Sequence, residues 1–228
     1  MIPESNSESP PPGRWLGGSH LPRCLREIPD PPTALCVRGR FDELPPAIAV
    51  VGSRRATPRG LRSAFSLGRD LASAGILVVS GLARGIDAAA LAGAVAAEGR
   101  GGAVLGSGID RIYPQENHRL AENLIAHGGF VATEFAESTP PRKHHFPRRN
   151  RLISGLSIAV VVVEAALRSG SLITARCALE QGREVCAFPG PVDAPQSEGC
   201  HALIQDGAAL VTGAEDLISW LGREFPQS

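Results

Sequence analysis

From Pro46 onward, apolar runs of strand length alternate with amphipathic stretches of helix length. Nearly continuous Val, Ile and Ala runs separated by helices are typical of a parallel sheet that is covered on both faces. The pattern predicts a doubly wound α/β fold with a mainly parallel sheet and right-handed crossovers. The expected strands are 47–51, 76–80, 102–105, 130–133, 158–164, 185–187 and 209–211, and the expected helices are 58–74, 86–98, 117–127, 172–182, 198–206 and 214–222.

The residues before this alternating region have a different composition. Proline clusters at 9–13 and 29–32 exclude long helices there. We therefore expect a disordered start over 1–21, an extended lead-in over 22–45, a single α/β domain over 46–222 and a short tail over 223–228.

Composition narrows the class of protein. No apolar run approaches the roughly 20 residues that a membrane-spanning helix needs, and the start lacks the basic and apolar regions of a signal peptide. We expect a cytoplasmic protein without a membrane partner. The chain has 5 cysteines and no C-x-x-C pair, so we expect buried thiols and neither a metal site nor a disulfide framework.

One segment concentrates positive charge in a chain whose formal net charge is +0. Residues 142–151 read Arg-Lys-His-His-Phe-Pro-Arg-Arg-Asn-Arg and include no carboxylate. A cluster of this kind favours a polyanionic ligand. Because apolar residues follow directly, we expect the cluster on a loop that leads into a core strand.

Four loops follow predicted strands, and ligands of doubly wound sheets bind at the carboxyl ends of the strands. The first begins Gly52-Ser53-Arg54, and its Thr57-Pro58 pair suits the N-cap and first position of a helix, whose free amides favour an anion. The others span 80–87, 106–114 and 169–174 and are also rich in glycine. Each glycine also suits an ordinary strand-to-helix turn, so no single loop decides the ligand.

Familiar nucleotide motifs are missing. The first turn has no G-x-G-x-x-G, position 72 is alanine where a ribose-binding acid would stand, and no Walker A sequence occurs. Glu164, at the end of an apolar strand, is the one candidate catalytic carboxylate, but it has no paired acid or base, so we expect it to brace the 169–171 turn. Asp87 and Asp110 are expected at helix starts or turns, and His118 and His201 in structural or surface positions.

Six ordered motifs over about residues 22–222 together resemble the DNA-processing protein A family, DprA or Smf. They are Gly52-Ser53-Arg54, residues 80–87, Tyr113-Pro114 with Asn117, residues 145–157, residues 169–175 and Gly199-Cys200-His201. The resemblance implies an extended Rossmann-like domain that binds single-stranded DNA with little sequence preference. It also implies a homodimer that protects incoming strands in natural transformation and loads the RecA recombinase.

The resemblance suggests roles for individual residues. Arg54 resembles a phosphate ligand, and Lys143 with Phe146 resembles a charge and base-stacking pair, which agrees with how single strands are bound without sequence preference. Asn150 and the amides near Gly81 and Ser171 complete the expected site. No catalytic residue, metal or cofactor is predicted. The full predicted set of nucleic-acid-binding residues is Gly52, Ser53, Arg54, Gly81, Arg84, Lys143, Phe146, Arg148, Arg149, Asn150, Ser169, Gly170 and Ser171.

Many family members carry a helical domain before this region and a winged-helix domain after it, so the chain is expected to be a minimal member or a fragment that retains the DNA site. Two other functions stay open. One is cleavage of the N-glycosidic bond of nucleoside monophosphates, which would use Glu164. The other is sensing of small nucleotides. By composition the apolar stretches 202–204 and 208–211 suit an ordinary helix and last strand, whereas the family resemblance favours a homodimer built near this end.

Overall fold

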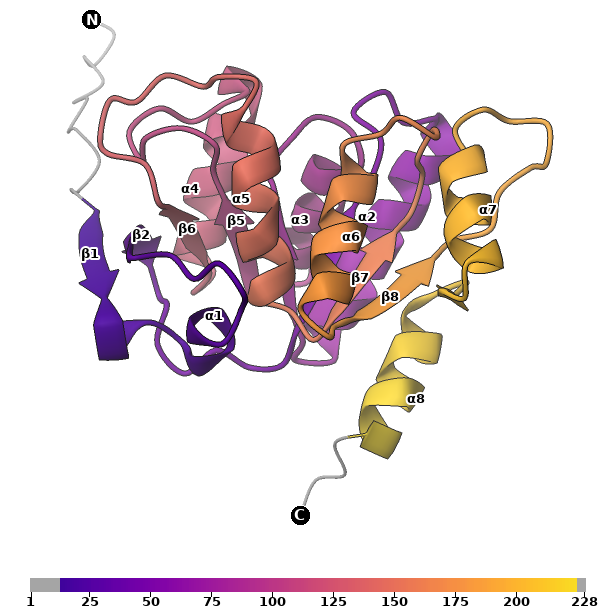
Figure 1. The fold of residues 1–228 in the computed structure, drawn as a ribbon, viewed down its shortest axis with the longest axis horizontal. Coiled ribbons are helices and arrows are strands. Elements are labelled where there is room, and N and C mark those ends of the chain that lie inside the picture. Colours follow the sequence, from indigo (N-terminus) through magenta and orange to yellow (C-terminus); the bar gives the residue numbers. More distant parts are fainter. Residues whose placement is uncertain (1–12, 225–228) are drawn as a thin grey trace, which may run out of the picture.

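A nine-stranded sheet runs through residues 13–224, which are the residues described by the computed structural model (Figure 1). The strand order is β1-β2-β6-β5-β4-β3-β7-β8-β9. The strands are β1 (Arg14–Gly17), β2 (Ala34–Gly39), β3 (Ala47–Val51), β4 (Leu77–Ser80), β5 (Gly101–Val104), β6 (Phe130–Thr133), β7 (Ala159–Val162), β8 (Glu184–Ala187) and β9 (Ala209–Leu210).

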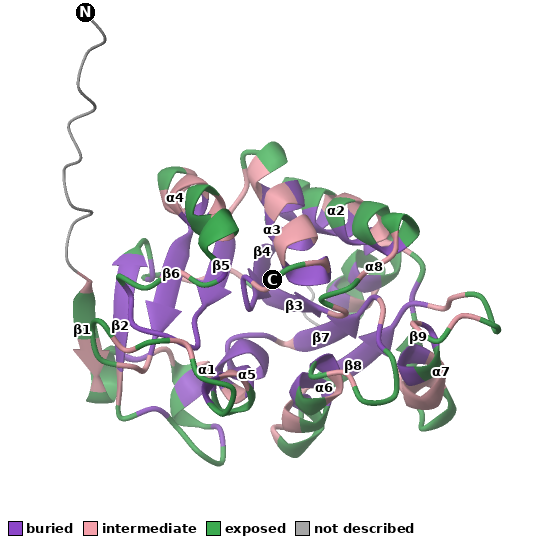
Figure 2. Cartoon of the chain, turned by 90° about the horizontal axis from the view of Figure 1, so that it is seen from above, coloured by how far each residue is buried: buried purple, intermediate pink, exposed green. Residues whose placement is uncertain are grey.

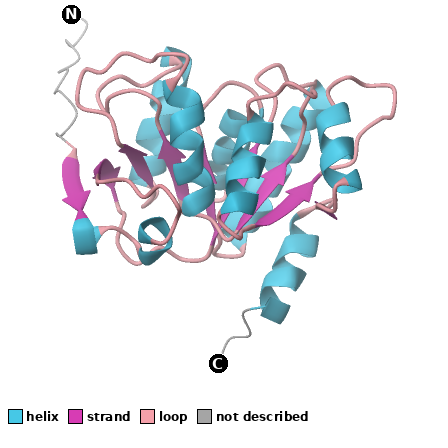
Figure 3. Ribbon diagram, viewed as in Figure 1, coloured by secondary structure: helices cyan, strands magenta, loops and turns pink. Residues whose placement is uncertain are grey.

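Helices connect these strands (Figure 3). The α-helices are α1 (Arg23–Arg26), α2 (Pro58–Ser73), α3 (Ile86–Ala96), α4 (His118–Ala126), α5 (His145–Gly155), α6 (Ser171–Glu180), α7 (Glu198–Gln205) and α8 (Ala214–Glu224), with short 3₁₀ turns at η1 (Gly18–His20) and η2 (Gln115–Asn117).

The strands from β6 across to β9 are all parallel, whereas β2 pairs antiparallel with both β1 and β6. After β3 the chain builds β4, β5 and β6 on one side, and it then returns to place β7 on the other side of β3. The strand order therefore reverses between β3 and β7. A crevice opens at such a reversal in doubly wound sheets, at the carboxyl ends of the strands.

Helices cover both faces of the sheet, as Figure 2 shows from above, and an apolar layer packs on each face. Ile48 and Val50 of β3 face the layer formed with α2, α3, α4 and α8, and the alternating residues Ala47, Ala49 and Val51 face the layer formed with α1, α5, α6 and α7. This alternation follows from the two-residue period of a strand. Because both faces are covered, the central strands are apolar along their whole length.

The predicted doubly wound α/β fold is confirmed. The strands expected at 47–51 and 130–133 have those bounds, and the other predicted strands and helices agree within two residues at each end. Thr57 is the N-cap of α2, where its side chain accepts a hydrogen bond from the Gly60 amide, and Pro58 is the first helical residue, as the sequence predicts.

The structure differs from the predictions at the N-terminal side. Residues 1–12 of the segment expected to be disordered lie outside the described residues, but Arg14–Gly17 forms β1 and pairs with β2 from the lead-in. These strands extend the sheet beyond β6, so the sheet begins well before residue 46. At the other end α8 reaches Glu224, inside the predicted tail, and residues 225–228 lie outside the described part of the chain.

The loop predicted over 142–151 is wrong, because α5 begins at His145 and continues through Gly155. Pro147 lies in the first turn, where a backbone N–H has no partner within the helix and proline is tolerated. Over residues 13–224, no helix combines the length and apolar character required to cross a bilayer.

Candidate functional site

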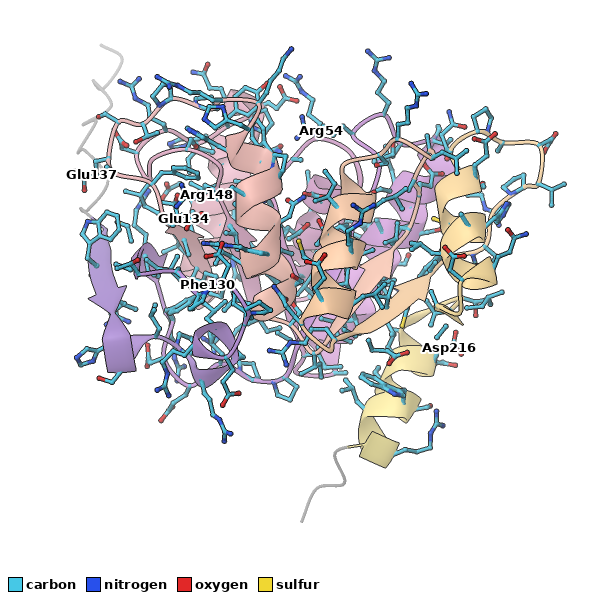
Figure 4. All side chains as sticks on the ribbon, in the orientation of Figure 1. Arg54, Phe130, Glu134, Glu137, Arg148 and Asp216 are labelled. Carbon is cyan, nitrogen blue, oxygen red and sulfur yellow. The ribbon has the colours of Figure 1, made fainter. Side chains whose placement is uncertain are left out.

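A cleft of about 770 Å³ lies where the strand order reverses. The loop after β3, the loop after β7 and the first turns of α5 and α6 form its walls. Figure 4 shows Arg54 at the upper rim of the molecule, at the end from which α5 and α6 start. The cleft therefore lies where doubly wound α/β folds commonly bind their ligands.

The loop after β3 leaves the strand in close contact with its surroundings. A Cβ at Gly52 would lie 2.7 Å from Cγ1 of Ile86 and 2.8 Å from the carbonyl oxygen of Glu164, so only glycine fits this exit from the strand. The Ser53 hydroxyl accepts a hydrogen bond from the Arg55 amide at 3.1 Å. Arg54 and Arg55 then project from the loop with exposed side chains.

Arg54 lies against an aromatic pair at the rim. The carbon at the centre of its guanidinium is 4.9 Å from the ring centroid of Phe146, a cation–π distance. The Phe146 ring is in turn 5.8 Å from the ring of Tyr113, centroid to centroid, with a tilt of 41°. Tyr113 is 43% exposed. A cation and two rings from three separate segments, two loops and the first turn of α5, thus share one rim.

Free positive charge gathers around this cleft. Arg54, Arg55, Lys143 and Arg168 all line it and have exposed side chains, and none forms a salt bridge with a residue in the 13–224 range. Many arginines elsewhere are paired with carboxylates. In a chain of zero formal charge, the cleft is therefore a local concentration of cations that have no carboxylate partner among the described residues.

The opposite wall is formed by Ser169, Gly170 and Ser171 at the start of α6. The hydroxyls of Ser169 and Ser171 lie 2.8 Å apart, within hydrogen-bonding distance. The Asn150 side-chain amide, on α5, donates to the carbonyl oxygen of Gly170 at 3.3 Å. This bond links α5 to the wall at the start of α6.

Arg149 lies beneath the cleft and is 3% exposed. It donates to the carbonyl oxygen of Val104 at 2.7 Å and occupies the space where a Cβ of Gly81 would stand. Burial lowers the pKa of Arg149 to about 10, against the effect of the nearby Asp87 carboxylate. Burial raises the pKa of Asp87, while Arg149 and the amides of Ala83 and Gly81 oppose this shift. The two residues form the charged floor of the site.

Glu164 braces the site, but not at the turn that the sequence suggests. Its carboxylate accepts hydrogen bonds from the Thr57 amide at 2.9 Å and from the Thr57 hydroxyl. Its backbone carbonyl accepts from the Ser53 amide at 2.7 Å. Glu164, two residues beyond β7, therefore holds the loop after β3, and the expected contact with the 169–171 turn is wrong.

Ten of the thirteen predicted site residues line the cleft, and three do not. Gly81 and Arg84 border a smaller neighbouring cavity of about 40 Å³, where the Gly81 amide donates to Asp87 and Arg84 forms a two-pronged ion pair with Glu116 at 2.6 and 2.7 Å. Arg148 pairs with Glu134 at 3.0 Å, away from Arg54 (Figure 4). The ten residues in the cleft are Gly52, Ser53, Arg54, Lys143, Phe146, Arg149, Asn150, Ser169, Gly170 and Ser171.

Among the lining residues that the predicted set lacks, three carry a cation or an aromatic ring: Arg55, Tyr113 and Arg168. Arg55 and Arg168 each follow a predicted strand within a few residues, a position that already singled out Arg54. Tyr113 ends the glycine-rich loop after β5, and it is the single tyrosine of the chain. Asp87 has the structural role expected for it at a helix start. Within residues 13–224 no cluster of potential metal ligands occurs.

Comparison with known proteins agrees with this geometry. The family model of DNA recombination-mediator protein A matches residues 15–222. Protein Smf of Escherichia coli is 50% identical over 198 residues, which cover 86% of this chain and 53% of Smf. The chain thus spans about half of that relative.

Two solved structures have the same fold. The crystal structure of DNA processing protein A from Streptococcus pneumoniae has a TM-score of 0.84 at 41% identity, covering 91% of this chain and 74% of that one. The structure that describes the single-stranded DNA binding mode of the Helicobacter pylori protein has a TM-score of 0.82 at 29% identity, covering 93% and 97%. The resemblance seen in the sequence motifs is confirmed, and the chain belongs to the DNA recombination-mediator protein A family.

Proposed function

We propose that the cleft binds single-stranded DNA and that the protein acts as a recombination mediator in natural transformation, protecting the incoming strand and delivering it to the RecA recombinase. The observation that carries this proposal is the convergence of Arg54, from the loop after β3, with Lys143 and Phe146, from the basic segment 142–151, on one cleft at the reversal of the strand order. The similarity to a DNA processing protein A with a described single-stranded DNA binding mode supports the same ligand.

The chemistry of the cleft suits an unpaired strand. Free guanidinium and ammonium groups bind backbone phosphates, and exposed rings stack on bases of any identity. A cleft that combines these two kinds of group binds single strands with little sequence preference. The binding surface needs no catalytic group for this role.

The main alternative is cleavage of nucleoside monophosphates, and the positions of the carboxylates argue against it. Glu164 does not line the cleft; it lines a smaller one of about 140 Å³ beside α2, and its oxygens accept hydrogen bonds from Thr57. Among the described residues lining the large cleft, Asp87 is the one carboxylate, and it is buried and bonded to backbone amides. Neither group is placed to activate water.

The salt dependence of DNA binding tests the proposal. With four free cations in the cleft, and a slope of about 0.7 per phosphate neutralised, affinity for a thymidine 30-mer should fall about 50-fold between about 50 and 200 mM salt. A filter-binding titration at the two concentrations measures this ratio. Incubation with AMP serves as the parallel assay for the alternative. Salt-independent binding, or release of adenine from AMP, would contradict the proposal.

The proposal includes a homodimer formed near β9. Within residues 13–224 this strand pairs with β8 alone, and Leu210 at the open edge is 54% exposed. An apolar side chain on an unpaired strand edge favours association with another chain.

Substitution Leu210→Glu is expected to shift the protein from dimer to monomer, because it buries a charge in the interface. Sedimentation or light scattering measures the mass. Val192→Glu is the matched control, since Val192 is 90% exposed in the loop before α7. A wild-type mass for Leu210→Glu, or a monomeric wild type, would rule out this surface as the dimer interface.

A further inference from the structure

Tyr113 is an exposed aromatic residue that borders two cavities. It lines the large cleft and also the neighbouring cavity of about 40 Å³, together with Arg54 and Phe146. These three side chains therefore form a ridge with open space on either side. A ring on such a ridge has surface available to a ligand.

The charges along the ridge are uneven. At the Phe146 end, Arg54 lies over the ring and Lys143 lines the same cleft, and neither is paired with a carboxylate in the described part of the chain. Near Tyr113, the guanidinium of Arg84 is neutralised by its two contacts with Glu116. Apart from Arg54 and the buried Arg149, the described lining of this smaller cavity holds no unpaired cation, so ring surface dominates the Tyr113 end and favours a base over a phosphate.

The spacing of the rings suits neighbouring bases. At 5.8 Å between centroids and a tilt of 41°, the rings are too close to admit a base between them, and they lie side by side as a stepped surface. Consecutive nucleotides of an extended strand are separated by a similar distance, so each ring can take one base. Arg54, which lies at Phe146, is placed to reach the phosphate between them.

We propose that Tyr113 and Phe146 form a two-ring platform on which two consecutive bases of the strand stack. The inference rests on the proposed function and assigns Tyr113 a contact with the ligand. Base stacking on an aromatic side chain is worth about 1–3 kcal/mol per base, which corresponds to about 5-fold to 150-fold in affinity.

The test compares the binding of a thymidine oligomer with that of an abasic oligomer of equal length. Tyr113→Ala and Tyr113→Leu should lose about 5-fold to 150-fold in affinity for the thymidine strand and little for the abasic strand. Tyr113→Phe, which keeps the ring, should recover most of that loss. Trp15→Ala removes another exposed aromatic, 49% exposed on β1 and outside both cavities, and should bind both strands as the wild type does.

A second arm separates direct contact from support of Phe146. In a Phe146→Ala background, Tyr113→Ala should still weaken thymidine binding, because each ring carries its own base. No further loss in that background, or equal losses on the two strands, overturns the platform. Wild-type binding by Tyr113→Ala overturns it too while leaving the proposed function intact, and a wild-type protein that binds no thymidine strand overturns both.

Discussion

Replacing Arg54 and Lys143 together by alanine is expected to lower the affinity for oligo(dT) by roughly 30-fold to several thousand-fold. Each residue supplies a charge-assisted contact to phosphate worth about 1–3 kcal/mol, and the pair should cost about 2–5 kcal/mol. Both side chains are exposed in the cleft and have no carboxylate partner among the described residues, so their removal leaves no buried charge behind. The fold should remain as stable as that of the wild type.

Fluorescence anisotropy with a labelled thymidine strand, at one fixed salt concentration, measures the loss. The matched control is Arg26→Ala with Arg223→Ala, which removes the same charge from exposed residues of α1 and α8, outside the cleft. If the control pair weakened binding as much as the cleft pair, the effect would come from net charge rather than from the site. Wild-type affinity in the Arg54 and Lys143 double variant would refute the assigned ligand contacts.

Substitution Arg149→Met is expected to destabilise the protein by about 3–5 kcal/mol, because it leaves the Asp87 carboxylate buried without its cationic neighbour. Arg149 is 3% exposed and Asp87 is 6% exposed. The guanidinium also fills the space beside Gly81 and donates to the carbonyl oxygen of Val104. Urea unfolding at neutral pH measures the difference in unfolding free energy.

The Asp87 carboxylate gives this prediction a pH dependence. Burial already raises the pKa of Asp87, and loss of Arg149 removes a group that opposes the rise. A carboxyl whose folded pKa exceeds its unfolded value of about 4 stabilises the fold below that pH, and the contribution is lost as the pH rises through the folded pKa. The deficit of Arg149→Met should therefore be smaller near pH 4 than at neutral pH. Adding Asp87→Asn to Arg149→Met should recover part of the lost unfolding free energy at neutral pH. If the loss of unfolding free energy were equal at both pH values, packing alone would be responsible.

The α/β pattern was predictable because both faces of the sheet are buried. Strand β3, for example, then reads as an unbroken apolar run that ends at the turn residue Gly52. Strands β1 and β2 were not predictable in this way, because β2 is buried where it pairs with the distant β6, and the more exposed β1 pairs with β2. Helix α5 was taken for a loop since its first turns are dominated by charge and proline, and its buried face becomes visible only when packed on the sheet.

The candidate site, like the fold, was predictable from the sequence only in part. Position after a strand correctly brought Arg54 and the 169–171 turn into one cleft, since the fold places these segments together. Position alone could not tell which cations of 142–151 are free. Lys143 lies in the cleft, Arg149 is buried beneath it, and Arg148 is paired with Glu134, because helical geometry points the side chains in different directions. Arg84 and Arg148 are engaged in ion pairs and so are not free to bind a ligand. Because these ion pairs join separate segments, no local sequence pattern predicts them.

The attachment of the Ser53–Thr57 loop to Glu164 has an energetic consequence for capture of a strand. Glu164, which follows β7, already fixes this loop through its carboxylate and its backbone carbonyl. The protein therefore loses little conformational entropy when DNA binds in the cleft. The loss of conformational entropy on binding then comes mainly from the DNA strand. Under the proposed function, flexible pyrimidine tracts should bind more readily than purine tracts, because purine tracts must first lose the stacking between their own bases. A protein that makes no contact with base edges can thus still prefer some sequences, according to how stiff the strand is.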